Sequence, residues 1–182
     1  MKILFPDATF DDNAAIERDV FPTDADIILA SARNAGDIAD ADWAKAEGLI
    51  VYIDLPIDAD VIDRLKNCKI ITRAGVGFDH IDIEAAARRG IPVCNVPDYG
   101  TTEVADHAIA LMLGLTRGLV SYHQRLIANP VAGWSWSGVP LVRRLRRTRF
   151  GVIGLGRIGT AVARRAQGLD MQVSFYDPHV PD

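Results

Sequence analysis

Short apolar runs recur along the first half of the chain at intervals of about 20 to 25 residues, and this rhythm restricts the possible folds more than any other feature. The stretches between the runs have the three- and four-residue spacing of amphipathic helices. Continuous apolar strands that alternate with helices are typical of βαβ units, in which helices cover both faces of a parallel sheet. We therefore predict that residues 1–98 form a small doubly wound α/β domain. Its expected strands are 2–5, 27–30, 49–53, 69–72 and 92–96.

The remaining residues, 99–182, predict a second unit of different composition. Apolar side chains spaced three and four residues apart predict one long helix over 102–128. Residues 129–147, which include Trp134 and Trp136, are rich in glycine, serine, proline and arginine and are expected to be a loop. A further βαβ unit follows, with strands over 149–155 and 171–176 and a helix over 157–169.

The sharpest local motif is Gly154-Leu155-Gly156-Arg157-Ile158-Gly159, because it follows an expected strand and begins an expected helix. Gly154 would permit the tight turn, Gly156 would leave room for a pyrophosphate, and Gly159 would let helix and strand pack closely. The helix amino terminus offers free N–H groups to phosphates. Asp177 ends the next strand 18 residues after Gly159. Its carboxylate would accept hydrogen bonds from ribose hydroxyls and repel a 2′-phosphate, which favours NAD over NADP.

Two other interpretations of this motif remain open. A glycine-rich turn can occur in an α/β domain that binds no ligand, and similar turns bind S-adenosylmethionine.

A second glycine motif, Arg73-Ala74-Gly75-Val76-Gly77-Phe78-Asp79, directly follows an expected strand. In open parallel sheets, ligands bind beyond the carboxyl ends of the strands. Two glycines there would let backbone N–H groups converge on an anion. Arg73 would add a charge-assisted bond to a carboxylate. The alternative is an ordinary βα turn with a surface arginine.

Charge is unevenly distributed along the chain. The net charge is −4, but residues 1–70 carry 7 basic and 15 acidic groups, whereas residues 71–182 carry 13 and 9. An acidic chain makes nucleic-acid binding unlikely, and the basic second half would suit an anionic ligand. Five arginines form a cluster that we interpret as a solvated connector or a surface facing an acidic partner subunit, the alternative being a patch that binds nucleic acid or another anion: Arg143, Arg144, Arg146, Arg147 and Arg149.

Several classes of protein are disfavoured by composition. The longest apolar run, Ala108 to Leu115, has eight residues, so we expect no membrane span. The chain starts without the apolar stretch of a secretory signal, and we expect a cytoplasmic location. Cys68 and Cys94 lie beside apolar runs and are interpreted as buried thiols, with no metal site.

Taken together, these motifs make the sequence similar to the D-isomer-specific 2-hydroxyacid dehydrogenase family, and most similar to its branch of phosphoglycerate dehydrogenases and C-terminal-binding-protein corepressors. The segments that carry the resemblance are 73–82, 90–97, 104–108, 151–159 and 176–178.

The resemblance implies a flavodoxin-like substrate domain (1–98) followed by the first βαβ unit of a Rossmann NAD domain (99–182). It implies substrate contacts at Arg73, Val76 and Gly77. It also implies a homodimer formed through helix 102–128 and loop 129–147. The cofactor contacts expected from the resemblance and the glycine motif are Val76, Val104, Gly154, Gly156, Arg157, Ile158, Gly159 and Asp177.

The resemblance also implies an NAD-dependent oxidoreductase that transfers a hydride to or from a small D-2-hydroxy or 2-keto acid. The family's catalytic arginine, glutamate and histidine follow the second Rossmann strand, so we assign no catalytic residue in this chain and expect it to be part of a longer protein. His107 is next to Asp106, but adjacent helical residues point about 100° apart. The alternative function is a non-catalytic, NAD-responsive module of the corepressor type.

Overall fold

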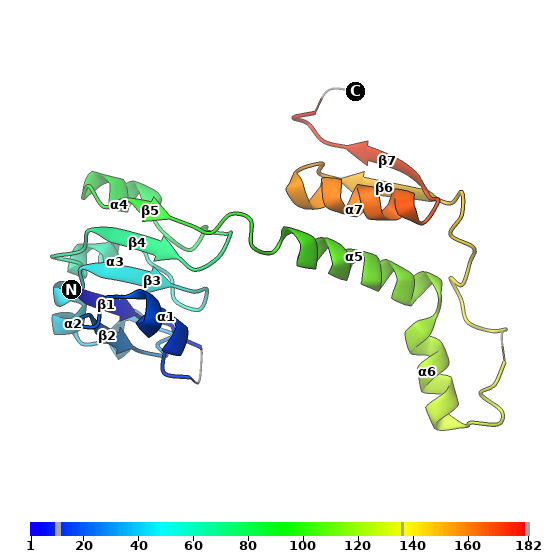
Figure 1. Ribbon diagram of the computed structural model, residues 1–182, viewed down its shortest axis with the longest axis horizontal. Helices are drawn as coiled ribbons and strands as arrows, with labels where there is room; N and C mark the ends of the chain where they lie inside the picture. The colour runs from blue at the N-terminus through cyan, green and yellow to red at the C-terminus, as the bar shows by residue number, and fades with distance from the viewer. Residues whose placement is uncertain (10–11, 136, 181–182) are drawn as a thin grey trace. The chain divides into compact units, whose positions relative to one another are not determined.

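The computed structural model describes residues 1–9, 12–135 and 137–180. The chain divides into two compact units, Met1–Tyr99 (unit 1) and Gly100–Asp182 (unit 2), which are drawn in Figure 1.

Unit 1 is built on a five-stranded sheet in which every pair of neighbouring strands is parallel. The strand order, β2-β1-β3-β4-β5, is that of flavodoxin-like folds. The doubly wound α/β fold predicted from the apolar rhythm is therefore confirmed. The strands are β1 (Lys2–Phe5), β2 (Asp26–Leu29), β3 (Gly48–Val51), β4 (Ile70–Arg73) and β5 (Val93–Cys94).

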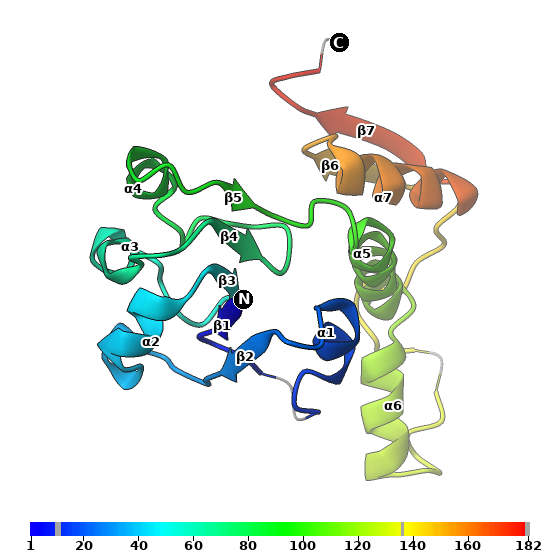
Figure 2. The same ribbon diagram turned by 60° about the vertical axis from the view of Figure 1, so that its left-hand side comes forward.

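Helices lie on both faces of this sheet, as Figure 2 shows. Alternate residues of β1 point to opposite faces, so Leu4 belongs to the larger apolar core whereas Ile3 and Phe5 belong to a smaller one. The larger core lies beneath the three helices over residues 40–45, 59–64 and 83–88. The helical elements are α1 (Ala15–Val20), the 3-10 turn η1 (Ala35–Asp37), α2 (Asp40–Lys45), α3 (Ala59–Arg64) and α4 (Ile83–Arg88).

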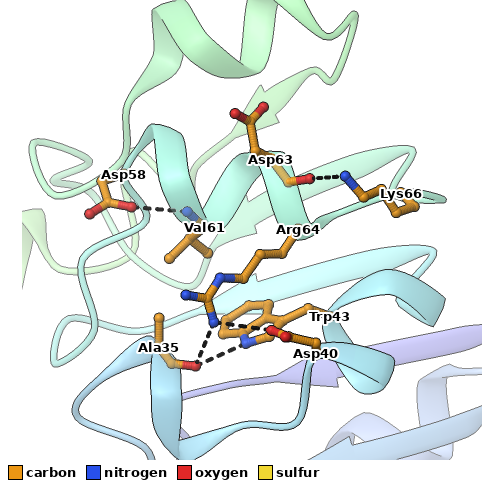
Figure 3. Close-up of polar contacts among 8 residues, drawn as sticks. All are labelled: Ala35, Asp40, Trp43, Asp58, Val61, Asp63, Arg64 and Lys66. Atoms are coloured by element: carbon orange, nitrogen blue, oxygen red, sulfur yellow. Dashed lines mark hydrogen bonds and ion pairs between the residues drawn. The ribbon is translucent and has the colours of Figure 1, made fainter.

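Polar contacts hold the larger core together at its rim (Figure 3). The fully buried Trp43 donates its indole N–H to the carbonyl of Ala35 at 3.1 Å, so its polar atom is satisfied. The guanidinium of Arg64 donates to the same carbonyl at 3.4 Å. Asp58 caps α3 by accepting a hydrogen bond from the backbone N–H of Val61 at 3.0 Å. The two hydrogen bonds to Ala35 connect α2 and α3 through η1, whereas the Asp58 contact stabilises the start of α3 alone.

Asp7 is the one charged side chain that is almost completely buried among the described residues, with 1% of its surface exposed. It follows β1 and accepts hydrogen bonds from the backbone N–H groups of Tyr52 (2.9 Å), Asp54 (3.0 Å) and Leu55 (3.4 Å). Its carboxylate therefore fixes the loop after β3 at the carboxyl edge of the sheet.

Unit 2 contains two parallel strands, β6 (Arg149–Ile153) and β7 (Gln172–Tyr176), connected by helix α7 (Arg157–Gly168). This is the predicted βαβ unit, and helix α5 (Thr101–Thr116) packs against α7. The buried residues that join these elements are Ala105, Ile109, Val162, Ala166 and Met171.

The prediction of one helix over 102–128 is wrong. Helix α5 ends at Thr116, and α6 (Leu119–Ala128) continues at an angle of 54°. Between them Gly118 is buried with φ +66°, a conformation that favours glycine, and a Cβ there would crowd the side chains of Val139 and Val142. The apolar periodicity continues across the bend, which is why the sequence pattern did not reveal it. Among the described helices none could span a membrane singly; only α5 and α6, as a bent pair, meet the length and composition criterion.

The interpretation of both cysteines as buried thiols is also wrong. Cys94 is exposed because β5 has only two residues and lies at the edge of the sheet. Cys68 is half-buried, and this burial raises the pKa of its thiol. In the predicted loop, Trp134 is largely exposed, and Trp136 lies outside the described residues.

Candidate functional site

A sharp turn joins β6 to α7, and its first glycine adopts a conformation that other residues rarely reach. Gly154 has φ +86°, and its N–H donates to the carbonyl of Tyr176 at 2.8 Å. This hydrogen bond continues the pairing of β6 with β7 into the turn. The chain then enters α7 at Arg157, with Gly156 as the N-cap residue and no side chain capping the helix.

The other two glycines of the turn have different structural surroundings. A Cβ at Gly159 would overlap the carbonyl oxygen of Gly154, so helix and turn pack with no room for a side chain. Apart from its chain neighbours, a Cβ at Gly156 would meet no atom of the described residues within 4 Å, and its φ of −70° is open to any residue. Neither packing nor backbone conformation therefore requires glycine at position 156. A ligand that approaches the backbone there would require it.

Asp177 follows β7 and lies beside this turn. One carboxylate oxygen accepts a hydrogen bond from the N–H of Leu155 at 2.6 Å, and the other from the N–H of His179 at 2.8 Å. These backbone hydrogen bonds, first that of His179 and then that of Leu155, lower the pKa of the carboxyl.

We predict that the Asp177 carboxyl titrates below the 3.8 of an ordinary aspartate, because both N–H groups bind its charged form. A lowered folded-state pKa means that the carboxylate stabilises the fold above the unfolded-state pKa, and that this contribution disappears as the pH falls through the folded value. Carbon-detected NMR of the side-chain carboxyl would measure it. A midpoint at or above 3.8 would contradict these hydrogen bonds.

In unit 1, the loop after β4 contains the second glycine motif. The Arg73 guanidinium lies directly over Gly75, in the space that a Cβ at position 75 would fill, and its Nε is buried without a hydrogen-bond partner among the described residues. The loop is held by two contacts from the segment after β5: the N–H of Val96 donates to Gly75 O at 2.9 Å, and the side-chain amide of Asn95 donates to Val76 O at 2.8 Å. Val76 and the following Gly77 are both exposed at the carboxyl edge of the sheet.

The structure places the residues predicted from sequence in two groups. In unit 2 the turn brings together Gly154, Gly156, Arg157, Ile158, Gly159 and Asp177. Val104, also in unit 2, lies half-exposed in the first turn of α5. Arg73, Val76 and Gly77 lie in unit 1.

Two residues near these loops were missed by the sequence analysis. Asp7 and Asn95 both support loops at the carboxyl edge of the unit 1 sheet. The signal for Asp7 was an acidic residue immediately after a buried strand. Asn95 had no comparable signal, because its role depends on a contact with a loop 19 residues earlier.

The structure offers no support for a catalytic pair in α5. The carboxylate of Asp106 accepts a hydrogen bond from Arg165, and His107 is exposed. Within residues 1–9, 12–135 and 137–180, no three His, Cys, Asp or Glu side chains are grouped as metal ligands.

Residues 14–174 match the family model of the D-isomer specific 2-hydroxyacid dehydrogenase catalytic domain. This match covers most of the chain. The chain belongs to this family.

Individual relatives agree with that assignment. The D-3-phosphoglycerate dehydrogenase of Archaeoglobus fulgidus is 44% identical over 136 residues, which are 75% of this chain and 25% of the relative. The crystal structure of an Aquifex aeolicus D-lactate dehydrogenase with NAD and lactic acid matches with a TM-score of 0.86 at 27% identity, covering 99% of this chain and 52% of that one. An NADPH-dependent glyoxylate/hydroxypyruvate reductase from Sinorhizobium meliloti, in complex with citrate, matches with a TM-score of 0.83 at 31% identity. The match covers 100% of this chain and 55% of that one. The chain thus spans between a quarter and just over half of these family members.

Proposed function

We propose that this chain binds NAD and is part of an oxidoreductase that acts on a small D-2-hydroxy or 2-keto acid. The observation that carries the proposal concerns Gly156. Neither packing nor backbone conformation among the described residues requires glycine there, and its missing side chain leaves open space in front of a helix amino terminus. That space suits a pyrophosphate. When bound, NAD would accept or supply the hydride.

On the cofactor side, the proposal assigns the pyrophosphate to the backbone N–H groups at the start of α7, around Arg157 and Ile158. Asp177 is assigned to the adenosine ribose, because its carboxylate lies next to the turn and has lone pairs beyond those used by the two backbone N–H groups. Its negative charge would disfavour a 2′-phosphate. Val76 and Val104 are assigned further cofactor contacts on the basis of family membership.

On the substrate side, the proposal assigns the carboxylate of the acid to the backbone of Val76 and Gly77. Arg73, whose guanidinium lies over Gly75, would supply positive charge beside them. We assign proton transfer to no residue described here. The chain's role is to bind and orient the two reactants.

We also propose that the family's homodimer forms through α5, α6 and the loop 129–147. Single exposed apolar residues are ordinary, but this segment exposes many of them, which favours a protein contact. Among the described residues of this segment, the large apolar side chains with more than half of their surface exposed are Leu111, Leu115, Leu119, Val120, Ile127, Val131, Trp134 and Leu141.

The second candidate function is a non-catalytic, NAD-responsive module of the corepressor type. The complete glycine turn is compatible with both candidates. An arginine, glutamate and histidine set after the second Rossmann strand of the whole protein would support the enzyme, and a whole protein without that set would support the module. Turnover of a 2-keto acid with NADH by the intact protein would exclude this candidate.

A titration of the protein with NADH, followed by the fluorescence of the reduced nicotinamide, tests the proposed function. We expect saturable binding, and we expect Asp177→Ala to weaken NADH binding about ten-fold, equivalent to about 1.4 kcal/mol, because the ribose loses its acceptor. NADPH affinity should fall less than NADH affinity, because the 2′-phosphate no longer meets a negative charge. The control is Asp60→Ala on the surface of α3, which should change neither affinity. Unchanged NADH affinity in Asp177→Ala would contradict the ribose assignment.

A further inference from the structure

We propose that Asp177 is also a positioning residue for the glycine turn, which its carboxylate holds in the phosphate-binding conformation before any ligand arrives. This inference rests on the proposed function and goes beyond the ribose contact. It assigns to one carboxylate two separable effects on dinucleotide affinity.

The contacts of Leu155 carry the inference. Leu155 lies between the two glycines of the turn, and its peptide groups are held from both sides. Its N–H donates to Asp177 Oδ2 at 2.6 Å, and its carbonyl accepts a hydrogen bond from Thr160 Oγ1 at 3.1 Å. Because Asp177 Oδ1 also accepts from the N–H of His179 at 2.8 Å, the carboxylate connects the β6–α7 turn to the segment that follows β7.

The turn is also held at Gly154, whose N–H donates to Tyr176 O and whose carbonyl packs against Gly159, but neither contact fixes the peptide that joins Leu155 to Gly156. Gly154 and Gly156 carry no side chains that could lock their peptide planes, and no side chain caps the helix at Gly156. The direction of the N–H groups that lead into α7, that of Gly156 above all, therefore depends on the orientation of the peptide that joins Leu155 to Gly156. A pyrophosphate gains most when those N–H groups already converge on it, since ordering them during binding costs affinity.

The two effects of Asp177 can be separated with a ligand that lacks the ribose hydroxyls. We therefore choose 2′,3′-dideoxyadenosine 5′-diphosphate (ddADP), which keeps the diphosphate but offers Asp177 no hydroxyl. Asp177→Asn and Asp177→Ala both remove the negative charge, but only asparagine retains an oxygen that can accept the Leu155 N–H. A difference between these two variants in ddADP affinity isolates the hydrogen bond to the turn.

We expect isothermal titration of the intact protein to show ddADP binding at least about five-fold weaker in Asp177→Ala than in Asp177→Asn. Thr160→Val, which removes the other restraint on Leu155 and is not a ribose contact, should weaken ddADP binding by a similar factor. Equal affinities in the two Asp177 variants, with Thr160→Val like the wild type, would overturn the inference.

A matched pair in unit 1 serves as the control. Asp58 also accepts a hydrogen bond from a backbone N–H, that of Val61, so Asp58→Asn and Asp58→Ala repeat the same chemistry away from the turn. This pair should leave ddADP affinity unchanged, and melting temperatures would verify that all variants are folded. If the wild-type protein binds neither ddADP nor ADP, the proposed function itself fails. If it binds both and the Asp177 variants agree, only the positioning role fails.

Discussion

Replacing Gly156 by alanine is expected to lower NADH affinity at least about ten-fold, or about 1.4 kcal/mol, while leaving the stability of the protein nearly unchanged. Apart from its chain neighbours, the added methyl group meets no atom of the described residues within 4 Å, and the φ of −70° suits alanine. The small loss of N-cap preference is offset by the lower flexibility of alanine in the unfolded chain. The methyl group would instead occupy the space that we assign to the pyrophosphate.

Gly159→Ala provides the contrast to this variant. Its methyl group would overlap the carbonyl oxygen of Gly154, so the helix must move away from the turn. Such crowding commonly costs about 1–3 kcal/mol. We expect Gly159→Ala to lower both the melting temperature and the NADH affinity, whereas Gly156→Ala lowers the affinity alone.

Thermal unfolding and NADH titration of the two variants would check this pair of predictions. A Gly156→Ala protein that binds NADH as tightly as the wild type would show that the open space is not the pyrophosphate site.

Removing the Asp7 carboxylate is expected to destabilise unit 1 by about 3 kcal/mol. Asp7→Ala leaves the N–H groups of Tyr52, Asp54 and Leu55 without their acceptor, and a buried donor that loses its partner costs about 1–3 kcal/mol. We expect the total to stay below the sum of three such penalties, since Tyr52 and Asp54 are only partly buried and water can reach their N–H groups. Asp7→Asn should lose less, because one oxygen remains as an acceptor.

Urea unfolding of Asp7→Ala would measure this loss. Asp26→Ala is the control, because Asp26 is an exposed aspartate whose ion pair with Lys2 at 3.1 Å contributes about 1 kcal/mol or less. An Asp7→Ala protein within about 0.5 kcal/mol of the wild type would mean that the loop after β3 keeps its place without the carboxylate.

The sequence predicted the strands well because buried parallel strands are continuous apolar runs, and this pattern does not depend on distant contacts. Four of the five predicted strands of unit 1 overlap the observed ones closely, whereas β5 is shorter than expected because only two of its residues pair with β4. The bend at Gly118 was missed for a physical reason. It depends on the packing of Val139 and Val142 from a later loop, which local periodicity does not encode.

In the candidate site, too, the sequence predicted features that depend on local residues and missed those that depend on distant contacts. The sequence predicted the tight turn at Gly154 and the close packing at Gly159, because each depends on residues that are near in the chain. The sequence did not predict that the Asp177 carboxylate contacts the Leu155 N–H, since 22 residues separate the two. Contacts of this range become visible only when the strands are paired.

The position of the Arg73 guanidinium over Gly75 limits how this loop can vary among related proteins. Any side chain at position 75 would collide with the guanidinium, which is the far end of a flexible side chain and would have to move away. A larger residue at 75 would be tolerated only with a shorter residue at 73, or with an arginine that turns elsewhere. Among relatives, an exchange at one position should therefore depend on the residue at the other.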